Sequence, residues 1–211
     1  MKKTLLFLFL SVTILGCKKA SETPDAGNNS YQPVSKGSYW KYSDTSPSGS
    51  SQSTFTMTGE QINIEGRIYY KYTVVNNGES YLGAGYFYAE NGVVMSATRP
   101  ADGESLFLKE DAAVGETWYL NKPVSVAATG GIGFPYPETV VTVVKLVEKG
   151  ISHTVSSKTF TNVIHTKHSQ QFTSTGTIDV EDYYIAKGVG MIERRSADGT
   201  NRSILVDYSI K

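Results

Sequence analysis

The sequence predicts a single all-β domain over residues 31–211, and three observations support this prediction. Several segments alternate apolar and polar residues with a period of two, which is typical of half-buried strands. The chain has 20 glycines and 14 tyrosines, a composition that favours strands joined by tight turns. Good helix formers nowhere recur with a helical period. Roughly ten short strands with hairpin connections predict an antiparallel meander that curls into a barrel or forms a two-sheet sandwich.

The first half of the domain contains two hairpins that are marked by their turn residues. Residues 62–64 lead into Glu65-Gly66, a two-residue turn, and residues 68–74 alternate as the returning strand. In "GYFYAENGVVMS", residues 85–96, Asn91-Gly92 supplies the positive φ angles that a type I′ turn requires. Both segments are therefore predicted to be antiparallel strand pairs.

The second half contains longer strands. Residues 139–155 form a predicted strand that turns at Glu148-Lys149-Gly150, and residues 204–210 alternate as the last strand. Gly188 and Gly190 lie between two strand-like segments and indicate a bulge or a sharp bend. Loops are expected at residues 46–53, 99–105 and 129–138, which are rich in turn-forming residues.

Residues 1–16 have the pattern of an export signal. Two lysines precede an apolar run of about twelve residues, which is shorter than the roughly twenty that a membrane-spanning helix needs. The run ends in "ILGC", residues 14–17, which includes the single cysteine of the chain. This motif resembles the lipobox of bacterial lipoproteins. The resemblance implies cleavage before Cys17, diacylglycerol on its sulfur and acylation of the new amino terminus; the alternative is a small buried thiol.

Residues 17–30 are predicted to be the lipidated cysteine and a flexible tether. The stretch "KKASETPDAGNNS" has no hydrophobic period, and such a composition cannot bury enough surface to order itself. We expect the domain to be held just off a membrane of the cell envelope. Lys18 rather than Asp follows Cys17, which under the enterobacterial sorting rule favours the outer membrane, on its periplasmic face or at the cell surface.

The charge of the chain argues against nucleic acid as a partner. The chain carries 20 basic and 20 acidic residues, and removal of Lys2 and Lys3 with the signal leaves 18 basic residues. No basic stripe or patch stands out. Because Cys17 is the only cysteine, no disulfide can stabilise the domain, and its own core must suffice.

Three glycine-containing motifs mark the domain. The pattern "P-x-x-x-G-x-x-W-x-Y" fits residues 33–42, "G-x-x-W" fits residues 115–118, and "A-K-G-V-G" is residues 186–190. With these motifs the chain resembles uncharacterised envelope lipoproteins, many of them from Bacteroidota. Its layout is similar to the TapB-like group and, more remotely, to periplasmic lipoprotein carriers with an open, curled sheet. The resemblance implies a curled half-barrel and supplies no catalytic residues.

Candidate catalytic and metal-binding groups are few. Gly188-x-Gly190 lacks the third glycine and the following helix of a phosphate site, and no G-x-S-x-G elbow is present. His165 and His168 have a spacing found in some metal sites, but residues three apart in a strand point to opposite faces. We therefore expect solvated or cross-strand histidines and neither a metal nor a cofactor.

One acidic pair resembles a glycosidase arrangement. Asp179 and Glu181 are two residues apart and would share one face of a strand at a separation of roughly 7 Å. Glycoside hydrolases use two carboxylates at a comparable distance. Such pairs normally come from different strands, so an ordinary acidic surface pair is the preferred interpretation.

Aromatic side chains are the most plausible binding feature. The candidates are Tyr81, Tyr86, Phe87 and Tyr88 in "YLGAGYFY", with Phe134 and Tyr136 in the loop at 129–138. Exposed rings at loop tips could stack on sugars, and rings around a concavity could hold an acyl chain. The alternative is that these tyrosines simply pack the sheet and rim its core.

The sequence therefore predicts a lipid-anchored, non-catalytic binding or accessory protein of the cell envelope. Its expected partners are the membrane, through Cys17, and an apolar ligand, a glycan or an envelope protein. The alternative is an envelope enzyme acting on polysaccharide or cell-wall substrates, and a purely structural role is a third possibility. An apolar concavity would favour binding, whereas a cleft with two facing carboxylates would favour catalysis.

Overall fold

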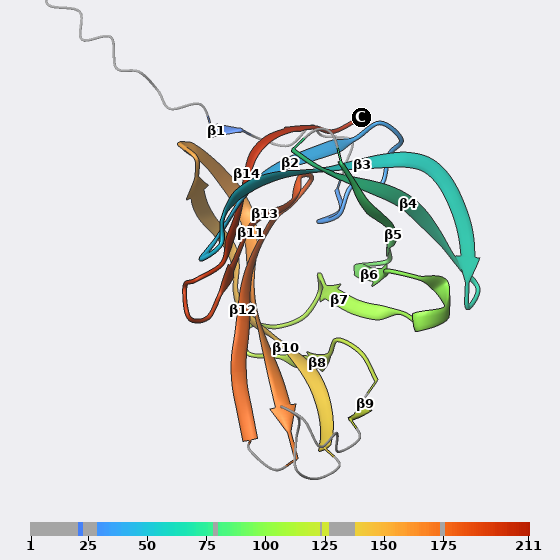
Figure 1. The fold of residues 1–211 in the computed structure, drawn as a ribbon, viewed down its shortest axis with the longest axis vertical. Coiled ribbons are helices and arrows are strands. Elements are labelled where there is room, and N and C mark those ends of the chain that lie inside the picture. The colour runs from blue at the N-terminus through green and yellow to red at the C-terminus, as the bar shows by residue number, and fades with distance from the viewer. Residues whose placement is uncertain (1–20, 23–28, 78–79, 123, 127–137, 174–175) are drawn as a thin grey trace, which may run out of the picture.

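The computed structural model describes residues 21–22, 29–77, 80–122, 124–126, 138–173 and 176–211 (Figure 1). The signal at residues 1–16 and the lipidation site Cys17 lie outside the described residues, so both stay predictions. Within the described ranges, no helix has the length and apolar character needed to cross a membrane. These ranges are almost entirely β-structure, as the sequence predicts.

The elements follow one another along the chain with one short 3₁₀ turn, η1, among the strands. They are β1 (Ser21–Glu22), β2 (Tyr39–Ser46), β3 (Gly49–Ile64), β4 (Arg67–Asn76), β5 (Ser80–Glu90), β6 (Val93–Ala97), η1 (Pro100–Asp102), β7 (Ser105–Lys109), β8 (Thr117–Tyr119), β9 (Val124–Val126), β10 (Glu138–Val155), β11 (Lys158–Phe172), β12 (Gly176–Ala186), β13 (Gly190–Ser196) and β14 (Arg202–Ser209).

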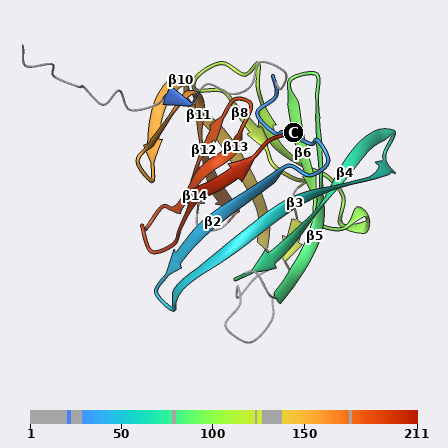
Figure 2. The same cartoon turned by 90° about the horizontal axis from the view of Figure 1, so that it is seen from above.

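All the described strands belong to one sheet, whose main path runs β7-β6-β5-β4-β3-β2-β14-β13-β12-β11-β10-β8. The path joins two antiparallel meanders, because β2 near the start of the domain pairs with β14 at its end. β9 pairs with β10, and β1 pairs with β11 in parallel orientation. Figures 1 and 2 show that the sheet curls around on itself. The predicted curled half-barrel is confirmed, and the two-sheet sandwich is wrong.

The two ends of the curled sheet, β7 and β8, meet along a line that we call the seam. The amide of Leu106 donates a hydrogen bond to the carbonyl of Leu120 over 2.7 Å. The indole Nε1 of Trp118 donates to the carbonyl of Leu106 over 3.0 Å. Lys109 and Glu116 form an ion pair across the same line. These few contacts replace a complete ladder, so the sheet is nearly closed.

Side chains alternate between an interior and an exterior face of the curled sheet. Two large clusters of buried residues form most of the core, one including Trp40, Met57 and Leu205, the other Leu108, Leu146 and Ile164. A third, smaller cluster contains Ile64, Tyr69 and Ala97 on the exterior of β3 to β6. The segment 98–104 closes over this third cluster, because Glu104 accepts a hydrogen bond from the Tyr69 hydroxyl over 2.7 Å.

Several predicted turns are confirmed. Glu65-Gly66 joins β3 to β4 and Asn91-Gly92 joins β5 to β6, and all four residues have positive φ angles. Gly188 and Gly190 form the bend between β12 and β13, with φ angles of 74° and 107°. The loop predicted at 99–105 contains η1 and separates β6 from β7.

Two predicted turns are placed wrongly. The chain does not turn at Glu148-Lys149-Gly150, since β10 continues to Val155 and reverses at Ser156-Ser157. Register shifts between β10 and β11 absorb Gly150 as an irregularity inside the strand. Most of the predicted loop 46–53 is also strand, because β2 and β3 form a tight hairpin that ends at Ser46 and Gly49.

Part of the predicted tether contacts the domain. Ser21–Glu22 forms the short strand β1 beside β11. The carbonyl of Ser30 accepts a hydrogen bond from the amide of Gly188 over 2.8 Å, and the Ser30 hydroxyl donates to Glu110 over 3.2 Å. Ser21–Glu22 and Ser30 therefore contact the body of the domain although both lie before its predicted boundary at residue 31.

Candidate functional site

An interior cavity of about 250 Å³ lies within the curl of the sheet. Most of its described lining is aromatic, with rings from Trp40, Tyr42, Phe55, Tyr72, Phe87, Phe107 and Tyr183. Gln32, Ser96 and Met191 complete that lining. These side chains carry no formal charge at neutral pH, so the cavity is suited to an apolar group.

One wall of the interior cavity is a row of rings from four neighbouring strands. Tyr42 meets Phe55 edge to face with 5.6 Å between centroids, Phe55 lies 5.5 Å from Tyr72, and Tyr72 stacks on Phe87 at 4.6 Å. Tyr72 is paired with Gly85 of β5. A Cβ at Gly85 would collide with the Tyr72 ring, so the glycine provides the space in which that ring lies. Strand register thus fixes the positions of the rings in this row.

The opposite wall joins β7 to β12. Phe107 meets Tyr183 edge to face at 5.3 Å, and the His168 ring lies 4.3 Å from the Tyr183 ring. His168 is only 4% exposed, and this burial lowers its pKa to about 4. Among the described residues, its Nε2 and the Thr166 hydroxyl have no hydrogen-bond partner. At neutral pH this wall is therefore backed by an uncharged imidazole.

The structure brings only part of the predicted aromatic set into this cavity. Phe87 lines it, whereas Tyr86 and Tyr88 belong to the exterior cluster, with 5.8 Å between the Tyr88 and Tyr69 rings. Tyr81 is in β5, but its side chain lies outside the described residues, as do Phe134 and Tyr136. Sequence reasoning missed the other six rings. For Tyr72, the alternation of residues 68–74 was the one sequence signal that could have indicated an inward-facing ring.

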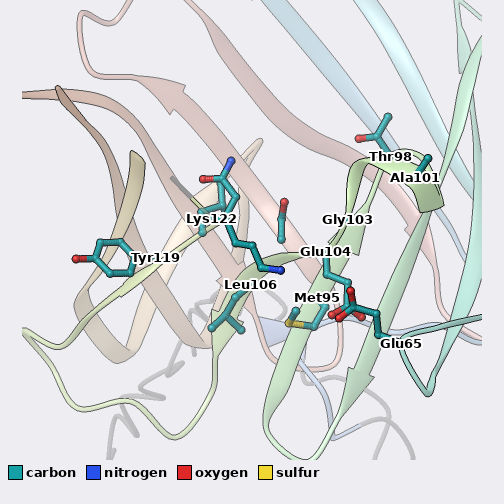
Figure 3. Close-up of a pocket in the computed structure, with 12 residues that line it drawn as sticks. Glu65, Met95, Thr98, Ala101, Gly103, Glu104, Leu106, Tyr119 and Lys122 are labelled. Carbon is teal, nitrogen blue, oxygen red and sulfur yellow. The ribbon is translucent and has the colours of Figure 1, made fainter. Parts of the chain in front are cut away.

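A second hollow of about 750 Å³ crosses the seam on the other side of β6 and β7 (Figure 3). We call it the seam groove; it is lined from residues 95–106 and 119–122 and by Glu65. Met95 and Leu106, which are paired across β6 and β7, face this groove. Their neighbours Ser96 and Phe107 face the interior cavity. One two-stranded wall therefore separates the two hollows.

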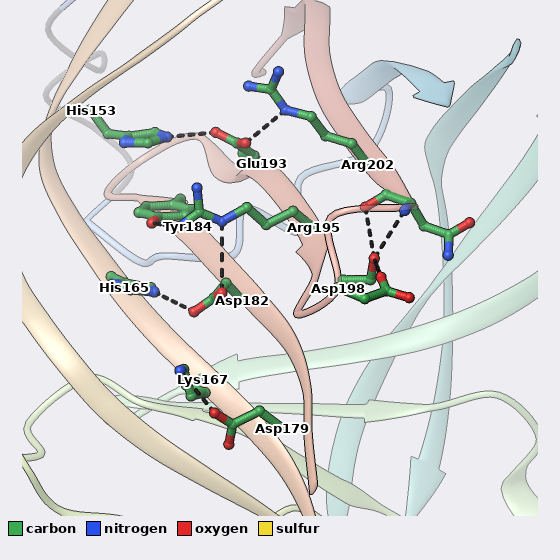
Figure 4. A network of polar contacts seen from close by, with 12 residues as sticks. His153, His165, Lys167, Asp179, Asp182, Tyr184, Glu193, Arg195, Asp198 and Arg202 are labelled. Carbon is green, nitrogen blue, oxygen red and sulfur yellow. Dashed lines mark hydrogen bonds and ion pairs between the residues drawn. The ribbon is translucent and has the colours of Figure 1, made fainter. Parts of the chain in front are cut away.

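A network of polar side chains crosses β10 to β14 (Figure 4). The Tyr184 ring is stacked between His153 and His165, with centroid distances of 3.9 and 4.4 Å. The guanidinium of Arg195 donates to the Tyr184 hydroxyl over 2.7 Å. Asp182 is hydrogen-bonded to His165 over 2.7 Å and lies 3.7 Å from Arg195. Because Tyr183 faces the cavity, its neighbour Tyr184 and this network lie on the opposite face.

Glu193 is the most deeply buried carboxylate of the polar network. It is hydrogen-bonded to His153 over 2.6 Å and accepts a bond from Arg202 over 2.8 Å. Burial raises the pKa of Glu193, but these two hydrogen bonds outweigh it and hold the pKa below its ordinary value. The carboxylate is therefore ionised and engaged at neutral pH, which indicates that it ties strands together.

Asp179 and Glu181 do not form a facing pair. A bulge in β12 pairs the two residues with adjacent positions of β11, so their side chains point to opposite faces. Asp179 accepts a hydrogen bond from Lys167 over 3.0 Å, while Glu181 accepts one from the Tyr183 hydroxyl. The prediction that they share one face is wrong, because the bulge changes the period-two alternation at this point.

The histidines lie where strand geometry predicts. His165 and His168 point to opposite faces, since one belongs to the polar network and the other contacts Tyr183. His153 and His165 are cross-strand partners of carboxylates, whereas His168 is buried rather than solvated. In the part of the chain that the structure describes, no group of three or more His, Cys, Asp or Glu side chains is arranged to hold a metal ion.

Comparisons with known proteins bear on the fold alone. The chain matches no protein-family model and no curated protein. Its structure is similar to the 2.70 Å crystal structure of a putative lipoprotein from Parabacteroides distasonis, with a TM-score of 0.54 and 12% identity over 86% of this chain and 99% of that one. A putative exported protein with a YmcC-like fold from Bacteroides fragilis gives a TM-score of 0.43 and 10% identity over 84% and 97% of the two chains. The first of these supports a shared β-fold, and function is argued from the cavities.

Proposed function

We propose that this chain is a lipid-anchored protein of the bacterial cell envelope that holds a small apolar ligand in its interior cavity. The observation that carries the proposal is the lining of that cavity, in which seven aromatic rings and one methionine accompany two uncharged polar side chains. Burial of apolar surface contributes about 25 cal/mol per Å². A ligand that filled this space would be stabilised by burying its apolar surface, and no charged group of the lining would lose its hydration.

The volume of the interior cavity limits the size of the ligand. Small-molecule sites commonly measure about 300 to 1,000 Å³, and this cavity of about 250 Å³ lies just below that range. It suits one ring or a short hydrocarbon segment rather than a complete lipid. A longer amphiphile would leave its polar end outside.

The seam offers a route into the cavity. Phe107 lines the cavity from β7, the terminal strand of the main path of the sheet. A full ladder joins β7 to β6, but only the contacts around Leu106, Trp118 and the Lys109–Glu116 pair join it to the opposite end. Strand edges with few hydrogen bonds open at low free-energy cost. We therefore place the entrance at the seam.

Anchoring in the envelope rests on the sequence. "ILGC" at residues 14–17 has the lipobox pattern, and Lys18 favours the outer membrane under the enterobacterial rule. The three glycine-containing motifs support relationship to TapB-like lipoproteins. Metabolic labelling with a palmitate analogue should mark the wild-type chain and leave Cys17→Ala unlabelled. Equal labelling of the two chains would disprove lipidation at this position.

Catalysis on polysaccharide has less support. The one acidic pair that the sequence offered is split between two faces of β12, and a glycosidase needs its two carboxylates to flank one bond. The described lining of the interior cavity contains no carboxylate. We therefore favour binding over catalysis for this cavity.

Native mass spectrometry tests the binding proposal. The full-length lipoprotein would be purified in mild detergent from the envelope in which it was made, and its mass compared before and after organic extraction. We expect a retained apolar species at up to one copy per chain. A protein whose mass is unchanged by extraction would contradict the proposal.

A further inference from the structure

The seam groove has the composition of a different kind of binding site from the interior cavity. Its walls come from β6, the segment that contains η1, the start of β7 and residues 119–122 at the end of β8, together with Glu65, so it straddles the two ends of the sheet (Figure 3). At about 750 Å³ it is three times the volume of the interior cavity. A chain of several small rings would fit a hollow of that size.

The charges of the groove are balanced. Glu65 and Glu104 contribute two carboxylates, and Lys122 extends its ammonium group toward them (Figure 3). Arg67 binds Glu104 over 2.5 Å and neutralises the second carboxylate. An anionic ligand would meet Glu65 and Glu104, and a cationic one would meet Lys122. The groove therefore favours a ligand without net charge.

One acceptor in the groove is held rigidly. Glu104 accepts hydrogen bonds from Tyr69 through Oε1, over 2.7 Å, and from Arg67 through Oε2. Its side chain is only 8% exposed. Because neighbours fix both oxygens, their remaining lone pairs point in set directions. The Glu104 side chain therefore loses little conformational entropy when a ligand hydroxyl donates to it.

The remaining lining combines hydrogen-bonding groups with apolar surface. Asn121 supplies an amide that both donates and accepts, and Thr98 and Ser105 supply hydroxyls. Leu106 forms part of the apolar surface, and Tyr119, with 63% of its surface exposed, lies at the other end of the groove from Glu104, with its hydroxyl directed away from Glu104 (Figure 3). Neutral sugars need this combination, since their hydroxyls both donate and accept while their C–H faces pack on exposed rings.

We propose that the seam groove binds a neutral saccharide, with Tyr119 as the stacking platform and Glu104, Asn121 and Lys122 as partners of the hydroxyl groups. This site is separate from the interior cavity, because β6 and β7 stand between them. The protein would thus contact an apolar group on one side of this wall and a glycan on the other.

Isothermal titration calorimetry tests the proposal. The full-length, detergent-solubilised protein is titrated with neutral hexasaccharides of glucose, mannose and xylose. Hexagalacturonate serves as the charged comparison. We expect at least one neutral hexasaccharide to bind with a Kd of millimolar or tighter and hexagalacturonate to bind more weakly. Tyr119→Ala should weaken binding by about fivefold or more, and Asn121→Ala should weaken it as well.

Two variants separate this site from the interior cavity and from general unfolding. Ser96→Leu, on the cavity side of β6, should leave saccharide binding unchanged, and Tyr119→Phe should retain most of it because the ring remains. The proposal would be overturned by a lack of binding to every neutral hexasaccharide at millimolar concentration. Binding that survives Tyr119→Ala and Asn121→Ala, or tighter binding of hexagalacturonate, would also overturn it.

Discussion

The indole nitrogen of Trp40 donates a hydrogen bond to the main-chain carbonyl of Val189, 149 residues later in the chain. The next residue, Gly190, has a φ angle of 107°, and a Cβ there would lie 3.2 Å from the same indole nitrogen. Tyr42 adds a second bond of this kind, from its hydroxyl to the carbonyl of Met191 over 2.9 Å. Two of the sequence motifs thus meet at the wall of the interior cavity, where they join the first meander to the second.

Trp40→Phe should lower the free energy of unfolding by about 1 to 3 kcal/mol, because the buried carbonyl of Val189 loses its donor. Urea unfolding followed by circular dichroism measures this change. Tyr39→Phe is the matched control: Tyr39 lies on β2 with Trp40, and its hydroxyl donates an exposed hydrogen bond to Asp207 of β14. Equal stability of the two variants would contradict the role assigned to Trp40.

Stability should fall as the pH is lowered from about 6.5 to about 4, because His168 is buried in its neutral form. Its pKa is about 4 in the folded chain and 6.5 when unperturbed. Between these two pH values His168 binds a proton in the unfolded chain but stays neutral in the folded chain, so protonation favours unfolding. Between pH 7 and pH 5 the loss should be about 2 kcal/mol.

The pH effect is measured by urea unfolding at both pH values in the wild type and in His168→Phe. The variant should lose less stability on acidification than the wild type, since it has no group to protonate at this position. An identical loss in the two proteins would show that other groups cause the pH dependence. The substitution leaves His153, His165 and their carboxylate partners in place, so the comparison isolates the change at His168.

The seam should open before the rest of the sheet. Trp118→Phe removes the hydrogen bond from the indole to the carbonyl of Leu106. We expect hydrogen exchange of the Leu106 amide, which bonds to Leu120, to accelerate by about tenfold. Amides between β3 and β4, remote from the seam in strand order, should be unaffected. A uniform acceleration over all strands would mean that Trp118 stabilises the whole fold rather than the seam.

Much of the fold could be predicted because local signals set it. Period-two alternation indicated strands, and Glu65-Gly66 and Asn91-Gly92 marked turns whose geometry needs positive φ. Other features depend on distant partners and leave little local trace. The pairing of β2 with β14 is one, and the passage of β10 through Gly150 is another, because only the register with β11 shows that the glycine lies inside a strand.

The candidate site was harder to predict than the fold. Phe87 was identified from its aromatic segment, but its neighbours Tyr86 and Tyr88 face the other way, as alternation requires. Phe107 and Tyr183 reach the same cavity from strands that are far apart in the sequence, so no local pattern joins them. The acidic pair failed for a different reason, since a single bulge in β12 reversed the face of one carboxylate.

The most direct test of apolar ligand binding compares the ligand that co-purifies with three chains made in the native envelope. Ser96→Leu adds side-chain volume inside the cavity, whereas Met95→Leu, on the opposite face of the same strand, nearly conserves volume. Ligand would be quantified by mass spectrometry after organic extraction. We predict ligand on the wild type and on Met95→Leu and little or none on Ser96→Leu. Equal amounts on all three chains, or none on the wild type, would contradict the assignment of the interior cavity as the binding site.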